Sequence, residues 1–157
     1  MKLLVFSDTH NDPERMPIVL ESEENVTACF FLGDGSADAD VLQQRYPAMP
    51  LYRVAGNCDL ASLDPLEGLA AFGGLLFFYT HGHTYGVKYR LDSLSEASKT
   101  RGANVVLFGH THVPFLEYVD NLYLFNPGSL SEPRMGGPTY GRISIENYTP
   151  RFEICDF

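Results

Sequence analysis

The sequence predicts one mixed α/β domain that spans residues 1–157. Short apolar runs of strand length recur along the chain, and in its first half they alternate with segments long enough to form helices. The composition, 45% hydrophobic and 20% charged residues, is typical of a globular protein. No repeat, linker or low-complexity tract interrupts this pattern, so the apolar runs are expected to share one fold.

The first half of the chain predicts a β-α-β-α-β unit. Three apolar runs mark its strands, at residues 3–6, 26–32 and 51–55. Residues 12–24 and 36–46 are long enough for the two helices, although Pro13 and Pro17 weaken the first of them. Such alternation is typical of parallel strands joined by crossover helices.

The second half begins with a predicted hairpin, in which Gly73-Gly74 forms a tight turn between residues 69–72 and 75–80. The L-L-F-F-Y run of its second strand is apolar enough either to be buried inside the fold or to form an interface between subunits. Apolar or alternating runs predict the other strands, at residues 105–108, 115–119, 122–125, 142–145 and 151–154.

The segment 90–99 is polar and amphipathic, which predicts a helix that ends at Gly102. Leu91, Leu94 and Ala97 recur at helical spacing along it and are expected to face the core. Nothing in this segment suggests a further role.

The chain is acidic, with a formal net charge of −9 and an isoelectric point near 4.8. A surface this negative repels nucleic-acid phosphates and anionic membranes unless a local positive centre offsets it, so neither is expected as a partner. No apolar stretch approaches the roughly eighteen residues of a membrane span.

The cysteines bear on where the protein is found. Cys29, Cys58 and Cys155 are odd in number and far apart, without C-x-x-C or disulfide spacing, which favours a reducing compartment. The N-terminal apolar run of four residues is too short for a signal peptide. A cytoplasmic protein is therefore expected.

Side chains with metal-binding atoms follow five of the predicted strands, at the point where each strand ends. They are Asp8 and His10, Asp34, Asn57, His81 and His83, and His110 and His112. All five histidines of the protein belong to this set, although turns ordinarily favour Asp, Asn and Gly rather than His. Ligands of α/β proteins bind beyond the carboxyl ends of the strands, so these side chains are expected to converge at one edge.

The types of side chain predict the kind of ion. Carboxylate and imidazole together favour divalent Mn, Fe, Zn, Co or Ni over Ca or Mg. Seven ligands from this set of eight side chains exceed the need of one tetrahedral ion and suit two ions that share a carboxylate. Two ions about 3.5–4 Å apart can activate a bridging water and hold a phosphoryl group for in-line attack. The sequence therefore predicts an anion-attracting dinuclear centre inside an acidic protein.

The order of these motifs resembles the signature of the calcineurin-like metallophosphoesterase superfamily. The motifs are D-x-H at residues 8–10, G-D at 33–34, G-N at 56–57, a histidine after a strand, and G-H-x-H at 109–112. The short chain, the G-N-C-D variant, the H-G-H segment and N-P-G-S at 126–129 are most similar to the small single-domain YfcE-type phosphodiesterases. The resemblance covers nearly the whole chain and implies a four-layer α/β/β/α sandwich of two mixed sheets.

The resemblance also implies a dinuclear site at the sheet edges, with two divalent ions per chain and manganese as the most expected ion. It divides the ligands into two groups that share one carboxylate: Asp8, His10 and His112, then Asn57, His81 and His110, with Asp34 as the bridge. The nucleophile would be a hydroxide that bridges the two metals. Asn57 adds no negative charge, which keeps the site electrophilic and allows its amide to contact substrate as well.

One position departs from the family pattern, because many members have a catalytic histidine where this chain has Cys58. A thiol is mostly neutral near its free pKa and is a weak hydrogen-bond donor. General-acid assistance typically contributes about 10²–10⁴-fold, so its loss favours substrates with good leaving groups unless His83 takes the role. Cys58 and His83 are thus the candidate catalytic side chains, although His83 equally fits a supporting hydrogen bond. Cys58 is disfavoured as a metal ligand, because Asn57 already fits the pattern.

Residues near the motifs have smaller predicted roles. Arg134 is a candidate to bind a substrate phosphate, although a single arginine in a loop is more often solvated. Asp59 is expected to orient either the G-N-C-D turn or a ligating histidine. Ser129 and Asn126 are expected to shape their loop.

The leading functional hypothesis is a metal-dependent phosphodiesterase for a small phosphate ester or a nucleotide. A phosphomonoesterase or protein phosphatase is an alternative, weakened by Cys58 and by a chain too short for a protein-binding cap. A non-catalytic scaffold, similar to the retromer subunit of this fold, is a second alternative, but the complete ligand set favours catalysis. A nuclease has little support in an acidic chain without a basic groove. A homo-oligomer is compatible with the sequence.

Overall fold

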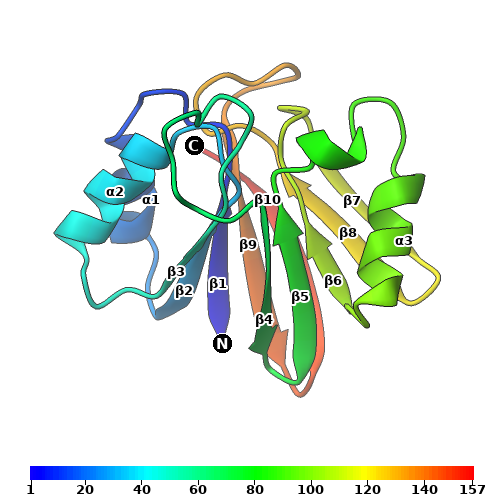
Figure 1. The fold of residues 1–157 in the computed structure, drawn as a ribbon. Coiled ribbons are helices and arrows are strands. Elements are labelled where there is room, and N and C mark those ends of the chain that lie inside the picture. The colour runs from blue at the N-terminus through cyan, green and yellow to red at the C-terminus, as the bar shows by residue number, and fades with distance from the viewer.

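The computed structural model describes residues 1–157 and contains two five-stranded mixed sheets that pack face to face. Helices α1 (Arg15–Ser22) and α2 (Ser36–Arg45) cover the outer face of one sheet, and α3 (Asp92–Thr100) covers the outer face of the other (Figure 1). This is the four-layer α/β/β/α sandwich that the family resemblance implied. No helix has the length and apolar character needed to cross a membrane.

The first sheet joins strands from the two ends of the chain in the order β10-β9-β1-β2-β3. β1 (Lys2–Phe6), β2 (Val26–Phe31) and β3 (Leu51–Arg53) are parallel, as their connection through α1 and α2 requires. β9 (Thr139–Glu146) and β10 (Thr149–Asp156) form a hairpin, and β9 pairs antiparallel with β1. The predicted β-α-β-α-β unit is therefore confirmed.

The second sheet has the order β4-β5-β6-β8-β7. β4 (Glu67–Phe72) and β5 (Leu75–Thr80) form the predicted hairpin, whose glycine turn adopts left-handed φ angles of 55° and 79°. A 3₁₀ turn, η1 (His83–Tyr85), and α3 then lead to β6 (Val105–Leu107), which lies parallel to β5 and β8. β7 (Pro114–Val119) and β8 (Leu122–Pro127) complete the sheet as a second hairpin.

Strand alternation decides which layer each apolar side chain fills. Leu3 and Val5 point into the space between the sheets, whereas Leu4 and Phe6 point toward α1 and α2. The Phe30 ring lies near the middle of the inner space, with its centroid 5.2–5.9 Å from those of four rings, Tyr52, Phe72, Phe77 and Tyr79. Burial of one such ring contributes about 1.5–3 kcal/mol. This core fixes the two sheets, and with them the loops at their edges.

The L-L-F-F-Y run of β5 packs inside the fold. Phe77 faces the other sheet and Phe78 faces α3, and both side chains are fully buried. Of the two alternatives for this run, internal burial is therefore the one that the structure supports.

Element boundaries differ from the predictions by a few residues. The first helix begins three residues later than predicted, and Pro17 falls in its first turn, where a backbone nitrogen has no helical partner to lose. α3 begins two residues later than predicted and buries Ser98 more fully than Ala97. Ser98 tolerates burial because its hydroxyl donates to the Leu94 carbonyl oxygen at 2.7 Å.

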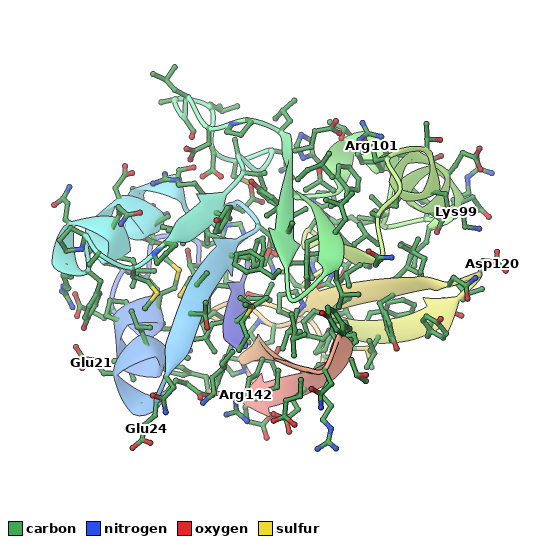
Figure 2. The ribbon with its side chains drawn as sticks, turned by 90° about the horizontal axis from the view of Figure 1, so that it is seen from below. Glu21, Glu24, Lys99, Arg101, Asp120 and Arg142 are labelled. Atoms are coloured by element: carbon green, nitrogen blue, oxygen red, sulfur yellow. The ribbon has the colours of Figure 1, made fainter.

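Two ion pairs lie on the outside of the layers. Lys99 of α3 pairs with Asp120 in the turn between β7 and β8 at 2.8 Å (Figure 2). Arg142 of β9 pairs with Glu153 of β10 at 2.8 Å. Exposed pairs of this kind contribute about 1 kcal/mol or less. The apolar layers, rather than surface charge, therefore hold the fold together.

Candidate metal centre

The predicted ligands converge at one edge of the sandwich, at the top of Figure 1, where strands of both sheets end. The first sheet contributes the residues that follow β1, β2 and β3, which are Asp8 and His10, Asp34, and Asn57. The second sheet contributes the residues that follow β5 and β6, which are His81, His110 and His112. The expected convergence is therefore observed, and it joins loops of the two sheets.

Five of these seven residues have a left-handed backbone. Their φ angles are 56° at Asp8, 45° at His10, 60° at Asp34, 67° at His110 and 58° at His112. Such a conformation costs a non-glycine residue roughly 1–3 kcal/mol, and it persists where the surrounding structure enforces it, most often at functional sites. The strand-end turns thus direct these side chains into the site, and their strained backbone lowers the free energy of unfolding.

Glycines allow the strand-end loops to approach one another closely. A Cβ atom at Gly109 would lie 1.9 Å from Ser7 Oγ, and one at Gly56 would lie 2.1 Å from Asp34 Oδ1. Neither contact admits a methyl group without displacing the loop beside it. The glycines of the G-H-x-H and G-N motifs are therefore required by packing next to the ligands.

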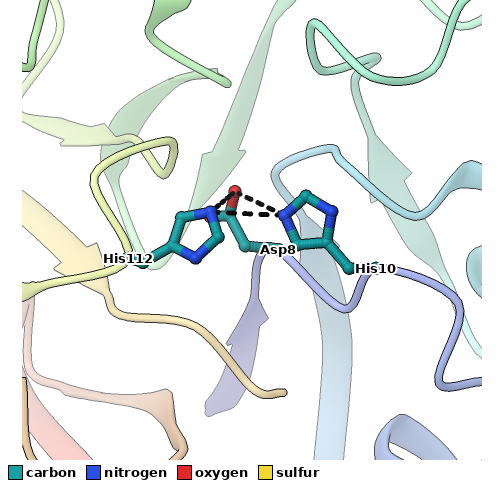
Figure 3. A group of neighbouring side chains, drawn as sticks. All are labelled: Asp8, His10 and His112. Carbon is teal, nitrogen blue, oxygen red and sulfur yellow. Dashed lines mark hydrogen bonds and ion pairs between the residues drawn. The ribbon is translucent and has the colours of Figure 1, made fainter. Parts of the chain in front are cut away.

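Asp8, His10 and His112 form the first group of facing ligand atoms (Figure 3). His112 Nε2 lies 3.2 Å from Asp8 Oδ1 and 3.2 Å from His10 Nε2. Asp8 is fully buried, and its Oδ2 accepts hydrogen bonds from Ser7 Oγ at 2.5 Å and from the His110 backbone at 3.1 Å. Its Oδ1 has no hydrogen-bond donor. An unpaired buried carboxylate oxygen beside two imidazole nitrogens is a cation-binding arrangement.

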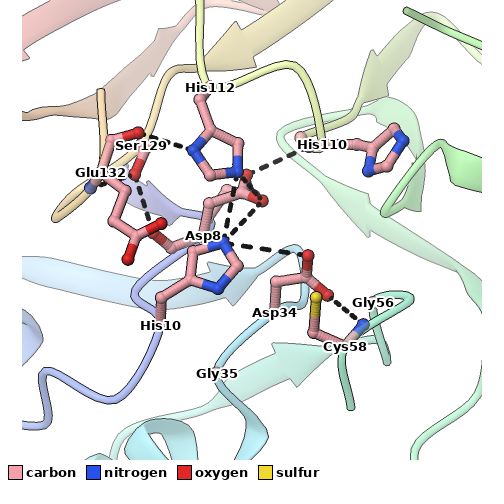
Figure 4. Close-up of polar contacts among 12 residues, drawn as sticks. Asp8, His10, Asp34, Gly35, Gly56, Cys58, His110, His112, Ser129 and Glu132 are labelled. Atoms are coloured by element: carbon pink, nitrogen blue, oxygen red, sulfur yellow. Dashed lines mark hydrogen bonds and ion pairs between the residues drawn. The ribbon is translucent and has the colours of Figure 1, made fainter. Parts of the chain in front are cut away.

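Asp34, His81, His110 and Asn57 form the second group. His81 Nε2 lies 3.1 Å from His110 Nδ1, 3.2 Å from Asn57 Oδ1 and 3.3 Å from Asp34 Oδ2. Asp34 Oδ2 also lies 3.9 Å from His10 Nε2, in the first group. The other oxygen of Asp34 is held by the Cys58 backbone N–H at 2.8 Å (Figure 4). One carboxylate oxygen therefore faces both groups.

Backbone carbonyls orient two of the histidines. His81 Nδ1 donates to the Leu32 carbonyl oxygen at 2.6 Å, and His112 Nδ1 donates to the Glu132 carbonyl oxygen at 2.6 Å. A carbonyl only accepts, so Nδ1 carries the proton and Nε2 of the neutral ring presents its lone pair to the site. This pattern is usual for metal-binding histidines. The residues present thus fit divalent cations.

Charges in the metal-free site shift its histidines in opposite directions. Burial lowers the pKa of His81, but its hydrogen bond to Asp34 and the charges of Asp8 and Asp34 outweigh burial and raise that pKa. The Asp8 carboxylate, whose Oδ1 lies 3.2 Å from His112 Nε2, raises the pKa of His112. Burial and the positive charge of His81 lower the pKa of His110 to about 4. Protons on His81 and His112 therefore compete with a metal ion.

We expect metal affinity to fall as the pH is lowered. Below the raised pKa values of His81 and His112, each incoming ion must displace a proton, which weakens binding about tenfold per pH unit for each proton displaced. In the metal-free protein the same shifts stabilise the fold below about pH 6.5, and this stabilisation is lost as the pH rises through the folded-state pKa values.

Calorimetric titration of metal-free protein with Mn²⁺ at several pH values between about 6 and 8 measures this dependence. Two buffers that do not bind Mn²⁺ and that differ in heat of ionisation report the protons released. An affinity that does not change over this range would contradict the assignment of His81 and His112 as ligands.

Asp59 organises the backbone around Asp34. Its Oδ2 accepts hydrogen bonds from the backbone of Asp34 at 2.7 Å and of Gly56 at 2.8 Å. Its Oδ1 accepts from the backbone of Gly35 at 2.9 Å and of Ser36 at 2.8 Å. Asp59 therefore orients the G-N-C-D turn, together with the start of α2, rather than a ligating histidine.

The N-P-G-S segment shapes the loops of the first group, as predicted. Asn126 donates to the Gly109 carbonyl oxygen at 2.9 Å. Ser129 Oγ donates to the Asp8 carbonyl oxygen at 2.8 Å (Figure 4). Ser129 Oγ also accepts from the Glu132 backbone at 2.8 Å, which connects Asp8 to the loop that positions His112.

The structure adds two features that the sequence reasoning missed. Asp38, buried in the first turn of α2, accepts hydrogen bonds from Thr9 Oγ1 at 2.6 Å and from the Asp12 backbone at 3.1 Å, so it fastens the loop after β1. A cleft of ≈ 570 Å³ also opens beside His10 and extends to the 59–64 loop. An acidic residue at the start of a predicted helix was a signal for the first feature, whereas nothing in the sequence pointed to the cleft.

The remaining predicted site residues lie beside the ligand groups. The His83 ring is centred 5.3 Å from that of His81, and its Nδ1 is buried without a partner. Arg134 is exposed, and its positive charge is close enough to oppose the rise in the pKa of His112. Cys58 is exposed next to Asp34. None of these positions by itself assigns a role.

Comparison with known proteins identifies the family. Residues 1–148 match the calcineurin-like phosphoesterase superfamily domain. The chain belongs to this superfamily. It is 30% identical to the phosphodiesterase YfcE of Escherichia coli K12 over 91% of this chain and 87% of the relative. The motif order in the sequence therefore pointed to the correct family.

Two further proteins with similar sequence or structure bear on the function. The crystal structure of a predicted phosphoesterase from Streptococcus pneumoniae TIGR4 superposes with a TM-score of 0.86 and 25% identity, covering 99% of this chain and 88% of that one. The vacuolar protein sorting-associated protein 29 of Schizosaccharomyces pombe is 26% identical over 99% of this chain and 84% of the relative. The similar proteins thus include one named for protein sorting as well as phosphoesterases.

Proposed function

We propose that this superfamily member is a metal-dependent phosphodiesterase that hydrolyses a small phosphodiester or nucleotide substrate at a dinuclear centre. The observation that carries the proposal is the position of Asp34 Oδ2, 3.9 Å from His10 Nε2 and 3.3 Å from His81 Nε2. One carboxylate between two sets of ligands supports a pair of ions rather than a single ion.

Each ion would be held by ligands from both sheets. The first would take Asp8, His10 and His112, the second would take Asn57, His81 and His110, and Asp34 would serve both. When bound, such a pair supplies Lewis-acid stabilisation of phosphoryl charge and lowers the pKa of the attacking water. Carboxylate, amide and imidazole donors suit manganese, with Fe, Zn, Ni and Co as alternatives that availability decides.

The surroundings of the centre suit a small anionic ester. Asn57 is uncharged, so two aspartates only partly neutralise a pair of dications and the site attracts phosphate. The amide of Asn57 and the guanidinium of Arg134 are the proposed substrate contacts, because the charge of Arg134 reaches the first group. The ≈ 570 Å³ cleft beside His10 and Cys58 is large enough for one ester group.

The same surroundings offer little general-acid assistance. Burial and the charge of Asp34 raise the pKa of the Cys58 thiol, which keeps it protonated and a weak donor. Burial and the charge of His81 lower the pKa of His83, which keeps that ring neutral near pH 7. Cys58 and His83 are the side chains that would contact the leaving group, and neither protonates it strongly. Diesters with good leaving groups are therefore the expected substrates.

The alternatives predict different behaviour. A phosphomonoesterase or protein phosphatase would need a stronger acid near the leaving group than Cys58 provides. A scaffold, which the similarity to the sorting protein favours, would bind metal without turning over either ester. The presence of every expected ligand at the site supports catalysis over the scaffold.

The test combines metal analysis with a rate assay. The purified protein is stripped of metal, loaded singly with Mn, Ni, Co, Zn or Mg, and assayed with a chromogenic phosphodiester and the matching monoester. We expect about two ions per chain and faster turnover of the diester. Faster turnover of the monoester would replace the proposal with a phosphomonoesterase. Bound metal without turnover of either ester would favour the scaffold.

A further inference from the structure

The side chains of Asn57 and Cys58, in the middle of the G-N-C-D motif, are neighbours, with Asn57 Nδ2 3.4 Å from Cys58 Sγ, but they lie near different ligands. Asn57 Oδ1 lies 3.2 Å from His81 Nε2, within the second ligand group. Cys58 Sγ instead lies with His10 and Asp34 in a separate cluster, whose ligand atoms are all within 4.8 Å of one another. The sulfur atom is drawn next to the Asp34 carboxylate in Figure 4. Asn57 therefore does not occupy the position that Cys58 could fill.

The cluster has the features of a cation site open to one more ligand. Zinc–sulfur and zinc–nitrogen bonds of about 2.3 and 2.0–2.1 Å place two ligand atoms of one tetrahedral ion roughly 3.6 Å apart, so a small movement of the sulfur atom would complete the site. The unpaired Oδ1 of buried Asp8 lies 3.9 Å from His10 Nε2. The Cys58 side chain is exposed and can turn, whereas its backbone N–H is fixed to Asp34.

We propose that Cys58 supplies a sulfur ligand to the ion at His10 and Asp34 when that ion is thiophilic. This inference rests on the dinuclear centre of the proposed function. As the sulfur–metal bond forms, the thiol proton passes to solvent and no electron is transferred. Zn²⁺, Cd²⁺ or Co²⁺ accepts thiolate readily, whereas Mn²⁺ prefers oxygen ligands. Cys58 thus makes the first metal position favour thiophilic ions over Mn²⁺.

The test is spectroscopic and does not use activity. Metal-free wild-type protein, Cys58→Ser and the matched control Cys155→Ser are titrated with Co²⁺, and the sulfur-to-cobalt charge-transfer band in the near ultraviolet is recorded. Cys155 is a suitable control because it is a partly exposed thiol on β10, which carries none of the ligands. The band is expected in the wild type and in Cys155→Ser, and it should be absent from Cys58→Ser.

Affinities and thiol protection complete the test. Cys58→Ser should lower Cd²⁺ affinity at least about tenfold while Mn²⁺ affinity stays within about twofold. In Cys155→Ser, Cd²⁺ should also protect Cys58 from a thiol reagent and Mn²⁺ should not.

Bound Co²⁺ without the band in the wild type, or a band that persists in Cys58→Ser, overturns the sulfur ligand and leaves the metal centre intact. Failure of all three proteins to bind either Mn²⁺ or Co²⁺ overturns the metal centre as well.

Discussion

Replacing Asp34 with alanine is expected to remove both metal ions and to abolish hydrolysis of the phosphodiester. Asp34 Oδ2 faces both ligand groups, at 3.9 Å from His10 Nε2 and 3.3 Å from His81 Nε2, closer to His81 than Asp8 Oδ1 is at 4.0 Å. Removing a residue that only hydrogen-bonds to a metal ligand already lowers metal affinity or activity about 10–100-fold. Removing a ligand that both ions share should lower them further. Metal analysis after dialysis, together with the diester assay, measures both effects.

The fold should survive this substitution, because the backbone N–H of residue 34 stays bound to Asp59. Alanine leaves the Cys58 N–H without its acceptor, which costs about 1–3 kcal/mol if water does not replace it. Asp34→Asn is the matched control, since it keeps the shape and removes the charge. An Asp34→Ala protein that retains two ions per chain would rule out the bridging role.

His112→Ala should remove one ion and leave the other. His112 belongs to the first group, where its Nε2 lies 3.2 Å from Asp8 Oδ1, and it has no contact with the ligands around His81. The variant is therefore expected to bind about one ion per chain and to lose at least about 10²-fold in diester turnover, because the two ions act together on one phosphoryl group. The circular dichroism spectrum of the metal-free variant should match that of the metal-free wild type.

His110→Ala is the matched control for this experiment. It should also leave about one ion, but the ion of the first group, so Co²⁺ spectra of the two variants should differ. Wild-type turnover in His112→Ala would exclude His112 from the catalytic centre. Loss of both ions in each variant would mean that the two positions fill only together.

Much of the fold follows from local patterns in the sequence. Runs such as Leu3 to Phe6 are buried on both faces, because a strand between two helices and a second sheet contacts apolar groups on each side. The limits of the elements were less predictable. β3 ends at Arg53, although the apolar run continues through Ala55, whose N–H donates to the Pro65 carbonyl oxygen at 2.9 Å, outside the sheet. Such endings depend on tertiary contacts that no local run contains.

The ligands could be predicted as a set, but their detailed chemistry could not. Which nitrogen of His81 or His112 faces the site is decided by the carbonyl oxygens of Leu32 and Glu132, which are distant in sequence. The role of Asp59 was open between two alternatives, and four backbone N–H groups decide it. These partners come together only in the folded chain, so their contacts cannot be predicted from composition and spacing.

The convergence of both sheets on one edge affects local unfolding of the protein at that edge. An ion bound by His10 and His112 ties together residues 102 positions apart, and the cysteines form no disulfide that could do so. Like a covalent crosslink, such a tie restricts the unfolded chain and gains in effect with the length of the loop it closes. Amide protons in the loops after β1 and β6 should therefore exchange with solvent faster in the metal-free protein than in the metal-loaded protein. Metal loading should also slow proteolysis of these loops. The bound metal would thus act as a reversible crosslink between the two sheets.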